Sequence, residues 1–139
     1  MNRDDFQRLA RLRLREARIL RDGGFPAGAY YLAGLAVECA LKACLARATQ
    51  KYDFPDKKTV NESHTHDLTT LLRLANLETV LQADAKTRPA IALNWTTVRD
   101  WRIEARYNRS TSVQQAADLY RAASQKQTGW SHGSDNIGK

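Results

Sequence analysis

One long apolar stretch, from Phe25 to Ala48, constrains the fold more than any other part of this sequence. Its 24 residues contain only three charges, at Glu38, Lys42 and Arg47. A helix this apolar has no polar face wide enough for water, so other parts of the protein must cover most of its circumference. The sequence therefore predicts an all-α fold: a bundle of four to five helices, with an antiparallel up-down core around a buried central helix.

Amphipathic segments before and after the central stretch are expected to cover it. Residues 3–21 combine an apolar stripe with acidic residues in the first turn, where negative charge suits the helix dipole. Gly23-Gly24 predicts a tight turn into the central helix, and Pro26 suits the first turn of that helix. Further helices are expected over residues 68–77, 89–105 and 112–126, the last with a capping box at its start, and a short amphipathic piece over 78–85. We expect one helical domain over residues 1–127 and a flexible C-terminal tail over 128–139.

The net charge of +7 has two interpretations. It favours an anionic partner such as RNA or a nucleotide, or it only keeps the protein soluble. Most of the excess positive charge is arginine, which can donate two parallel hydrogen bonds to a phosphate group, whereas lysine cannot. In the first helix, Arg8, Arg11, Arg15 and Arg18 recur at steps of three and four residues and share one face. That face is either simply solvated or a ridge that meets phosphates.

The two cysteines indicate where the protein resides. Cys39 and Cys44 both fall in the central helix, five residues apart, so they point in different directions and cannot bridge within it. Two thiols without a disulfide framework indicate a reducing, cytoplasmic setting, and residues 1–21 lack the apolar region of an export signal. The central helix is long enough to cross a membrane, but its central charges make insertion unfavourable. We expect no membrane association, no cofactor and no metal.

Glu38 needs a partner, because a carboxylate on so apolar a helix is costly to bury alone. Lys42 lies four residues later on the same side and can form a pair with it. The alternative, which we favour, is an arginine supplied by the segment RDWRIEARY at residues 99–107.

Two histidines stand in a polar loop expected over residues 49–66. His64 and His66 alternate along an extended segment, a pattern that could in principle suggest a metal site. Without a third ligand, a capping or packing role is favoured over metal binding. Thr65 or Asp67 is expected to cap the helix that follows.

The segment 99–109 carries the main functional prediction. Its candidate phosphate- or nucleic-acid-binding residues are Arg99, Arg102, Arg106, Tyr107, Asn108 and Arg109. The first three arginines stand at i, i+3 and i+7, so a helix would gather them along one side. Such a strip suits a phosphate or a flipped-out base, and the supporting residues would be Glu38, Lys42 and Glu104. The alternative is a salt-bridge network that locks this helix onto the central one.

The order of four stretches resembles a known family. A basic first helix is followed by GAYYLAGLAVECALKACLA, then HDLTTLL, then NWTTVRDWRIEARYN. Over about residues 5–125 this order is similar to small bacterial members of the HEPN family (higher eukaryotes and prokaryotes nucleotide-binding). The resemblance implies an all-α bundle of four or five helices that is often a homodimer. It implies a role as an RNA-cleaving toxin or defence nuclease, or as the helical partner of a small nucleotidyltransferase.

This sequence departs from the family at its catalytic motif. Active members carry an arginine, four to six residues, and then a histidine, and the motifs of two protomers meet at the dimer cleft. Here Arg102 is followed by four residues and then Tyr107, and no histidine occurs between His66 and His132. Tyrosine can position a phosphate or a 2′-hydroxyl, but it is a poor general acid–base at neutral pH. The departure weakens the expectation of ribonuclease chemistry and leaves RNA or nucleotide binding intact.

Three functions remain after this departure. The first is a dimeric module in a toxin–antitoxin, defence or stress context that binds RNA or nucleotide without strong nuclease activity. The second is a metal-independent endoribonuclease toxin that uses the cluster of Arg102, Arg106 and Tyr107, with Arg102 and Tyr107 as its catalytic residues. The third is a purely structural adaptor for a nucleotidyltransferase partner.

Overall fold

The computed structural model describes residues 1–50 and 61–125 of the chain. Its helices are α1 (Arg3–Asp22), α2 (Pro26–Gln50), α4 (Leu68–Leu74), α5 (Glu78–Thr87), α6 (Pro89–Arg99), the 3-10 helix η1 (Ile103–Tyr107) and α7 (Val113–Ser124). No strand occurs in these two ranges, and the predicted all-α class is confirmed. Residues 51–60 of the predicted loop, the domain boundary at 127 and the predicted tail lie outside the described residues.

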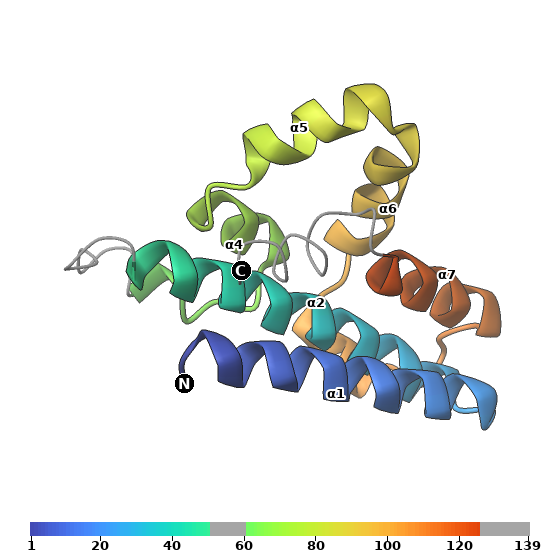
Figure 1. The fold of residues 1–139 in the computed structure, drawn as a ribbon. Coiled ribbons are helices and arrows are strands. Elements are labelled where there is room, and N and C mark those ends of the chain that lie inside the picture. Colours follow the sequence, from blue (N-terminus) through green and yellow to red (C-terminus); the bar gives the residue numbers. More distant parts are fainter. Residues whose placement is uncertain (51–60, 126–139) are drawn as a thin grey trace.

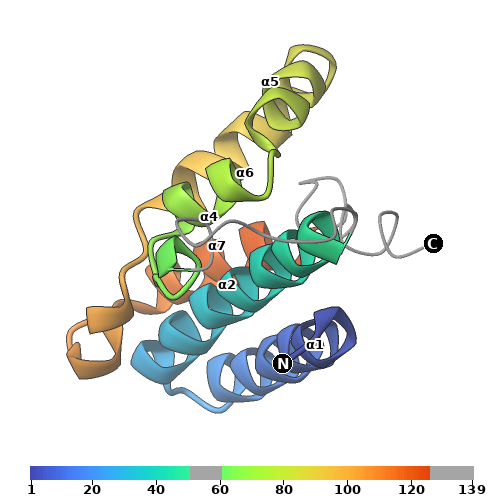
Figure 2. The same ribbon diagram turned by 90° about the vertical axis from the view of Figure 1, so that its left-hand side faces the viewer.

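Helices α1 and α2 form an antiparallel hairpin (Figures 1 and 2). A capping box between Asn2 and Asp5 starts α1, and Gly23 ends it by donating its N–H to the carbonyl of Ile19 at 2.9 Å. Gly24 has φ +86°, a left-handed backbone that suits glycine. The predicted turn is therefore confirmed, and its two glycines have separate roles.

Helix α2 is the interior element around which the others pack. It contacts α1, α4, α7 and η1, and its buried residues include Ala33, Val37 and Leu41. Within the described ranges, Pro26–Ala48 is long and apolar enough to cross a membrane, but 67% of its most apolar window is buried by the fold. The predicted buried central helix is confirmed.

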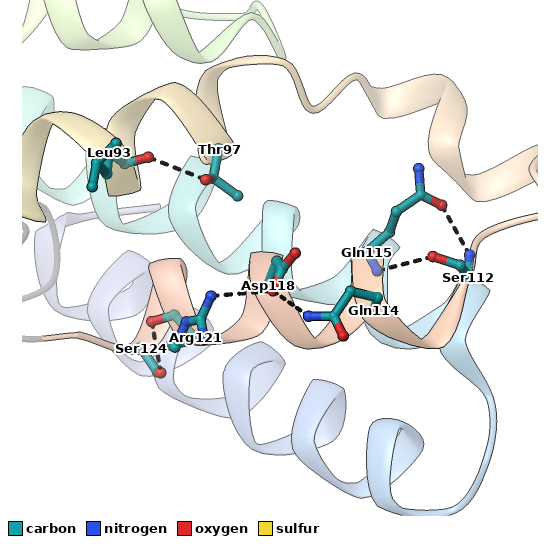
Figure 3. A network of polar contacts seen from close by, with 8 residues as sticks. All are labelled: Leu93, Thr97, Ser112, Gln114, Gln115, Asp118, Arg121 and Ser124. Carbon is teal, nitrogen blue, oxygen red and sulfur yellow. Dashed lines mark hydrogen bonds and ion pairs between the residues drawn. The ribbon is translucent and has the colours of Figure 1, made fainter.

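Helix α7 packs on α2, and the side chain of Ser112 caps its N-terminus. Ser112 Oγ accepts the N–H of Gln115 at 3.0 Å, and Gln115 Oε1 accepts the N–H of Ser112 at 2.9 Å (Figure 3). This reciprocal pair is the predicted capping box. The buried residues Leu119, Ala122 and Ala123 join the core shared with α2.

The start of helix α4 was predicted from the sequence, but its end was not. Asp67, one of the two predicted caps, accepts the N–H groups of Thr69 and Thr70. The helix ends at Leu74 rather than at residue 77, because Asn76 takes a left-handed backbone with φ 60°. Leu77 N–H then donates to the carbonyl of Leu72, which satisfies an end carbonyl of the helix.

Helices α5 and α6 extend away from the α1–α2 hairpin (Figure 1). α5 has no buried residue and packs on α6, whereas α6 buries Ile91 and Val98 and also contacts α7. The chain therefore leaves the compact part at α4 and returns to it through the second half of α6. That return brings residues 99–109 to the side of α2.

Candidate nucleic-acid interface

The helix predicted over residues 89–105 is wrong from residue 100 onward, since α6 ends at Arg99. Asp100 follows with φ −81° and ψ −9°, and Arg102 is fully extended with φ −130° and ψ 149°. A short 3-10 helix, η1, then runs to Tyr107. The arginines of this segment therefore do not line one side of a helix.

The reason for the break is the burial of Trp101 against α2. Its indole is fully buried and lies over Gly34, where a Cβ atom would come closer than 3.0 Å to three of its ring atoms. Tyr31 stacks on the same ring, with centroids 6.4 Å apart. An indole can approach the α2 backbone this closely only where glycine leaves room. Burying it there draws the chain out of the α6 helix.

Arg102 lies at this break and hydrogen-bonds to the end of α6. Its Nη1 donates to the carbonyl oxygens of Arg99 at 2.9 Å and Trp101 at 3.0 Å. Carbonyls at a helix C-terminus lack intrahelical partners, and a cationic side chain is a favourable donor to them. The residue itself is exposed, and its guanidinium makes no other hydrogen bond within the described residues.

The rest of the segment presents arginine and aromatic surface to water. Arg106 lies over the ring of Tyr107, 4.8 Å from its centroid, and Tyr107 is 73% exposed. Asn108 Oδ1 accepts the N–H of Ser110 at 2.8 Å, a turn that fixes the chain after η1. Arg99 and Arg109 are exposed as well. The predicted residues are therefore all exposed within one short segment, although not along a helical face.

None of the four arginines between residues 99 and 109 pairs with a carboxylate inside the described ranges. Elsewhere, arginines do pair, as in Arg73–Glu62 at 2.9 Å and Arg121–Asp118 at 3.1 Å. Asp100 and Glu104 are close in sequence but form no such pair in this part of the chain. The alternative of a salt-bridge network through these arginines therefore finds no support in the geometry.

Tyr30 is a site residue that the sequence did not single out. It is half-buried in α2, and burial first, then the negative charge of Asp100, raises the pKa of its hydroxyl, while Arg102 lowers it. The phenol therefore lies within the electrostatic reach of both side chains. The signal in the sequence was weak, because AYYLAG reads equally well as helix-packing residues.

Glu38 is bound by a histidine, so the favoured prediction of an arginine partner from residues 99–107 is wrong. Its Oε1 lies 2.8 Å from Nδ1 of His66, and its Oε2 lies 3.4 Å from Nζ of Lys42. The Lys42 pair was the other predicted option and is confirmed. His66, 28 residues further along the chain, was expected only to cap or pack, and no periodic pattern links two positions this far apart.

His64, unlike His66, makes no side-chain contact with a carboxylate among the described residues. It is exposed, and its backbone N–H donates to the carbonyl of Asn61 at 3.4 Å. In the described part of the chain, no group of three or more His, Cys, Asp or Glu side chains could hold a metal ion.

Comparison with protein families matches residues 4–125 to the HEPN domain. No curated protein and no solved structure gives a match. The matched range begins at the second residue of α1 and ends one residue after α7, so it covers the helices described above apart from Arg3.

Proposed function

Because this chain belongs to the HEPN domain family, whose members have nucleotide- and RNA-related functions, we propose that it binds RNA or nucleotide phosphates through residues 99–109. We call these residues the arginine segment. One observation carries the proposal: four exposed arginines stand within eleven residues of chain, and none of them pairs with a carboxylate among the described residues. One of them, Arg106, lies over the exposed ring of Tyr107, 4.8 Å from its centroid.

The chemistry of the arginine segment suits a phosphate backbone. Guanidinium groups donate two parallel hydrogen bonds to phosphate oxygens and remain charged at every physiological pH. Tyr107 adds an exposed aromatic face on which an unpaired base can stack, a contact worth about 1–3 kcal/mol per base. Single-stranded RNA, which offers both phosphates and splayed bases, fits this surface better than duplex RNA.

The test compares two double variants with equal loss of charge. Arg102→Ala/Arg106→Ala removes two guanidinium groups from the arginine segment, and Arg15→Ala/Arg18→Ala removes two from the exposed face of α1. Binding of a fluorescent single-stranded RNA is measured at several salt concentrations. The first variant should lose affinity, with a salt slope reduced by about 1.4 at about 0.7 per phosphate contact. The α1 variant should bind like the wild type.

Equal losses in both variants would mean that only net charge attracts RNA, and unchanged binding in the first would reject the arginine segment. The structural-adaptor alternative makes a different prediction, namely that Arg102→Ala unfolds the protein instead of giving a folded, non-binding chain. Thermal unfolding by circular dichroism separates these results. We expect a folded variant, since Arg102 is exposed and donates to only two carbonyls.

We also propose the assembly and setting that the family favours. The protein would act as a cytoplasmic homodimer in a toxin–antitoxin, defence or stress system, where a nucleotidyltransferase-type protein is a possible partner. Light scattering after gel filtration tests the dimer, and a monomer at micromolar concentration would contradict it. Loss of growth on overexpression, relieved by Arg102→Ala, would support the toxin setting.

A further inference from the structure

We propose that the outer face of α1 binds an acidic amphipathic helix of a partner protein. This face, which we call the α1 face, consists of the exposed residues Arg8, Arg11, Leu12, Arg15, Arg18 and Ile19. Such binding is independent of RNA binding at the arginine segment, because it uses other residues. The charge pattern of α1 left open only solvent or phosphate as the surroundings of these arginines, whereas the structure adds two exposed apolar side chains beside them.

The α1 face lies along one side of the helix, away from the core. At about 100° per residue its six members fall within an arc of about 120°, and Ala17, which is fully buried, lies opposite them. Helix α1 contacts α2 and α7, and Figure 2 shows it at the edge of the molecule beside α2. The α1 face is therefore accessible to a partner.

Two large apolar side chains stand exposed on the α1 face. Leu12 is 43% exposed and Ile19 is 61% exposed. They are seven residues apart in sequence, so they lie about two turns apart on the same side of the helix. This is the spacing at which apolar residues repeat along the seam between two paired helices. A second helix laid along α1 can therefore cover both side chains at once.

The arginines of the α1 face lack carboxylates, because the acidic residues of α1 are already engaged. Each of the four acidic side chains of this helix has a nearby partner, and the pairs are Arg3–Asp4, Arg13–Glu16, Arg21–Asp22 and Asn2–Asp5. Arg8, Arg15 and Arg18 pair with no carboxylate in the described part of the chain. Positive charges gathered in this way favour a partner that supplies the missing carboxylates.

Among possible occupants, a protein helix fits this combination of charge and apolar surface best. RNA would neutralise the arginines but leave Leu12 and Ile19 uncovered. A second copy of the chain would bring arginines against arginines, since a two-fold contact pairs a surface with itself. A membrane surface takes up helices with a broad apolar side, whereas the broad apolar side of α1 is packed on α2.

The arrangement of the α1 face specifies the chemistry of the partner helix. Leu12 and Ile19 lie along one edge of the face, and the arginines extend from there to the other edge. A matching helix therefore has one line of apolar residues, with glutamate or aspartate along the side that meets the arginines. Arginine and carboxylate can form two parallel hydrogen bonds, which would fix the register of the two helices.

The test uses a synthetic peptide of three heptads as the partner helix. Leucine at positions a and d gives it an apolar line, and glutamate at e and g makes the flanks acidic; repulsion between glutamates opposes pairing of the peptide with itself. A second peptide carries lysine at e and g. Fluorescence anisotropy measures the binding of each peptide to the full chain. The wild type should bind the glutamate peptide, more weakly as salt is raised, and should not bind the lysine peptide.

Three double variants separate the α1 face from a general effect of charge. Arg15→Ala/Arg18→Ala and Leu12→Gln/Ile19→Gln should each bind the glutamate peptide at least about tenfold more weakly, as expected for loss of interface anchors. Arg102→Ala/Arg106→Ala loses as much charge as the first variant but should bind the peptide like the wild type. Circular dichroism checks that each variant is folded, as expected for substitutions at exposed positions.

Failure of the wild type to bind the glutamate peptide would overturn the proposal. Equal losses in the two arginine variants would do the same, since net charge alone would then attract the peptide, and so would unchanged binding by Leu12→Gln/Ile19→Gln. Light scattering and sedimentation with phosphatidylglycerol vesicles test the other occupants. A dimer that Leu12→Gln/Ile19→Gln dissociates, or vesicle binding that this variant abolishes, would assign the α1 face to a second copy or to a membrane instead. RNA binding by the arginine segment is measured separately and is decided by neither result.

Discussion

Replacing Gly34 by alanine should destabilise the protein, because the added methyl group would occupy space filled by Trp101. A Cβ at this position would lie closer than 3.0 Å to three atoms of the indole, whereas carbon atoms in contact prefer about 3.5–4.0 Å. Trp101 is fully buried, so the ring cannot swing into solvent without losing its core contacts. Overpacking costs about 1–3 kcal/mol, and complete loss of a buried tryptophan about 3–5 kcal/mol. We therefore expect a loss of about 3 kcal/mol.

The assay is thermal and urea unfolding of Gly34→Ala beside Gly28→Ala. Gly28 stands in the same helix, but its Cβ would meet only the flexible end of Leu20, at 3.1 Å. That control should lie within about 1 kcal/mol of the wild type, since alanine favours helix. For 139 residues at about 2.1 cal/mol/K each, a loss of 3 kcal/mol lowers the Tm by about 10 °C.

Equal stability of the two glycine variants would refute the close contact between Trp101 and α2. A double-mutant cycle makes the test stricter. In a Trp101→Leu background the clash is gone, so Gly34→Ala should cost much less there, and purely additive losses would contradict a direct contact.

Three further predictions concern single contacts. Ser112→Ala should lower stability by about 1 kcal/mol in urea unfolding through loss of the α7 cap, while Ser110→Ala, whose side chain caps nothing, should be neutral. Glu38→Ala should cost about 3 kcal/mol, because it leaves the ammonium of Lys42 mostly buried without its partner; Glu38→Ala/Lys42→Met should recover part of that loss. Burial, and secondly the charge of Glu38, raises the pKa of the Cys39 thiol to about 11 from 9.0. The neutral thiol therefore gives its full contribution to stability below pH 9, and this contribution is lost as the pH rises towards 11. Over that range the free energy of unfolding of the wild type should fall by up to about 2–3 kcal/mol more than that of Cys39→Ala.

Much of the fold could be predicted because its signals are local. The charge-poor stretch around Glu38 identified the interior helix, and the pairing of Ser112 with Gln115 identified the start of α7. The glycine pair at Gly23-Gly24 identified the turn between α1 and α2. Each of these three features depends on residues within a few positions of one another, so it can be recognised from the local sequence.

The end of α6 could not be predicted in this way. Residues 100–105 contain no glycine or proline and continue a helical spacing, so the local pattern favours an uninterrupted helix. The contact that ends the helix joins Trp101 to Gly34, 67 positions earlier. It depends on fitting the large indole ring against a residue that has no side chain. The contact of His66 with Glu38 was missed for the same reason.

The contact that ends α6 also explains why the arginine segment is open to solvent. In a continuous helix, Arg99, Arg102 and Arg106 would share one side of the helix. With Trp101 buried, Arg102 instead hydrogen-bonds to the free carbonyls at the helix end, and η1 turns Tyr107 and Arg109 into water. The side chain that stabilises the break is thus also the one expected to meet a phosphate. Binding of a phosphate to Arg102 should therefore stabilise the end of α6, measurable as slower amide exchange at Trp101, whose N–H donates to the carbonyl of Val98 at 3.0 Å. RNA that binds without slowing that amide would place the ligand elsewhere on the protein.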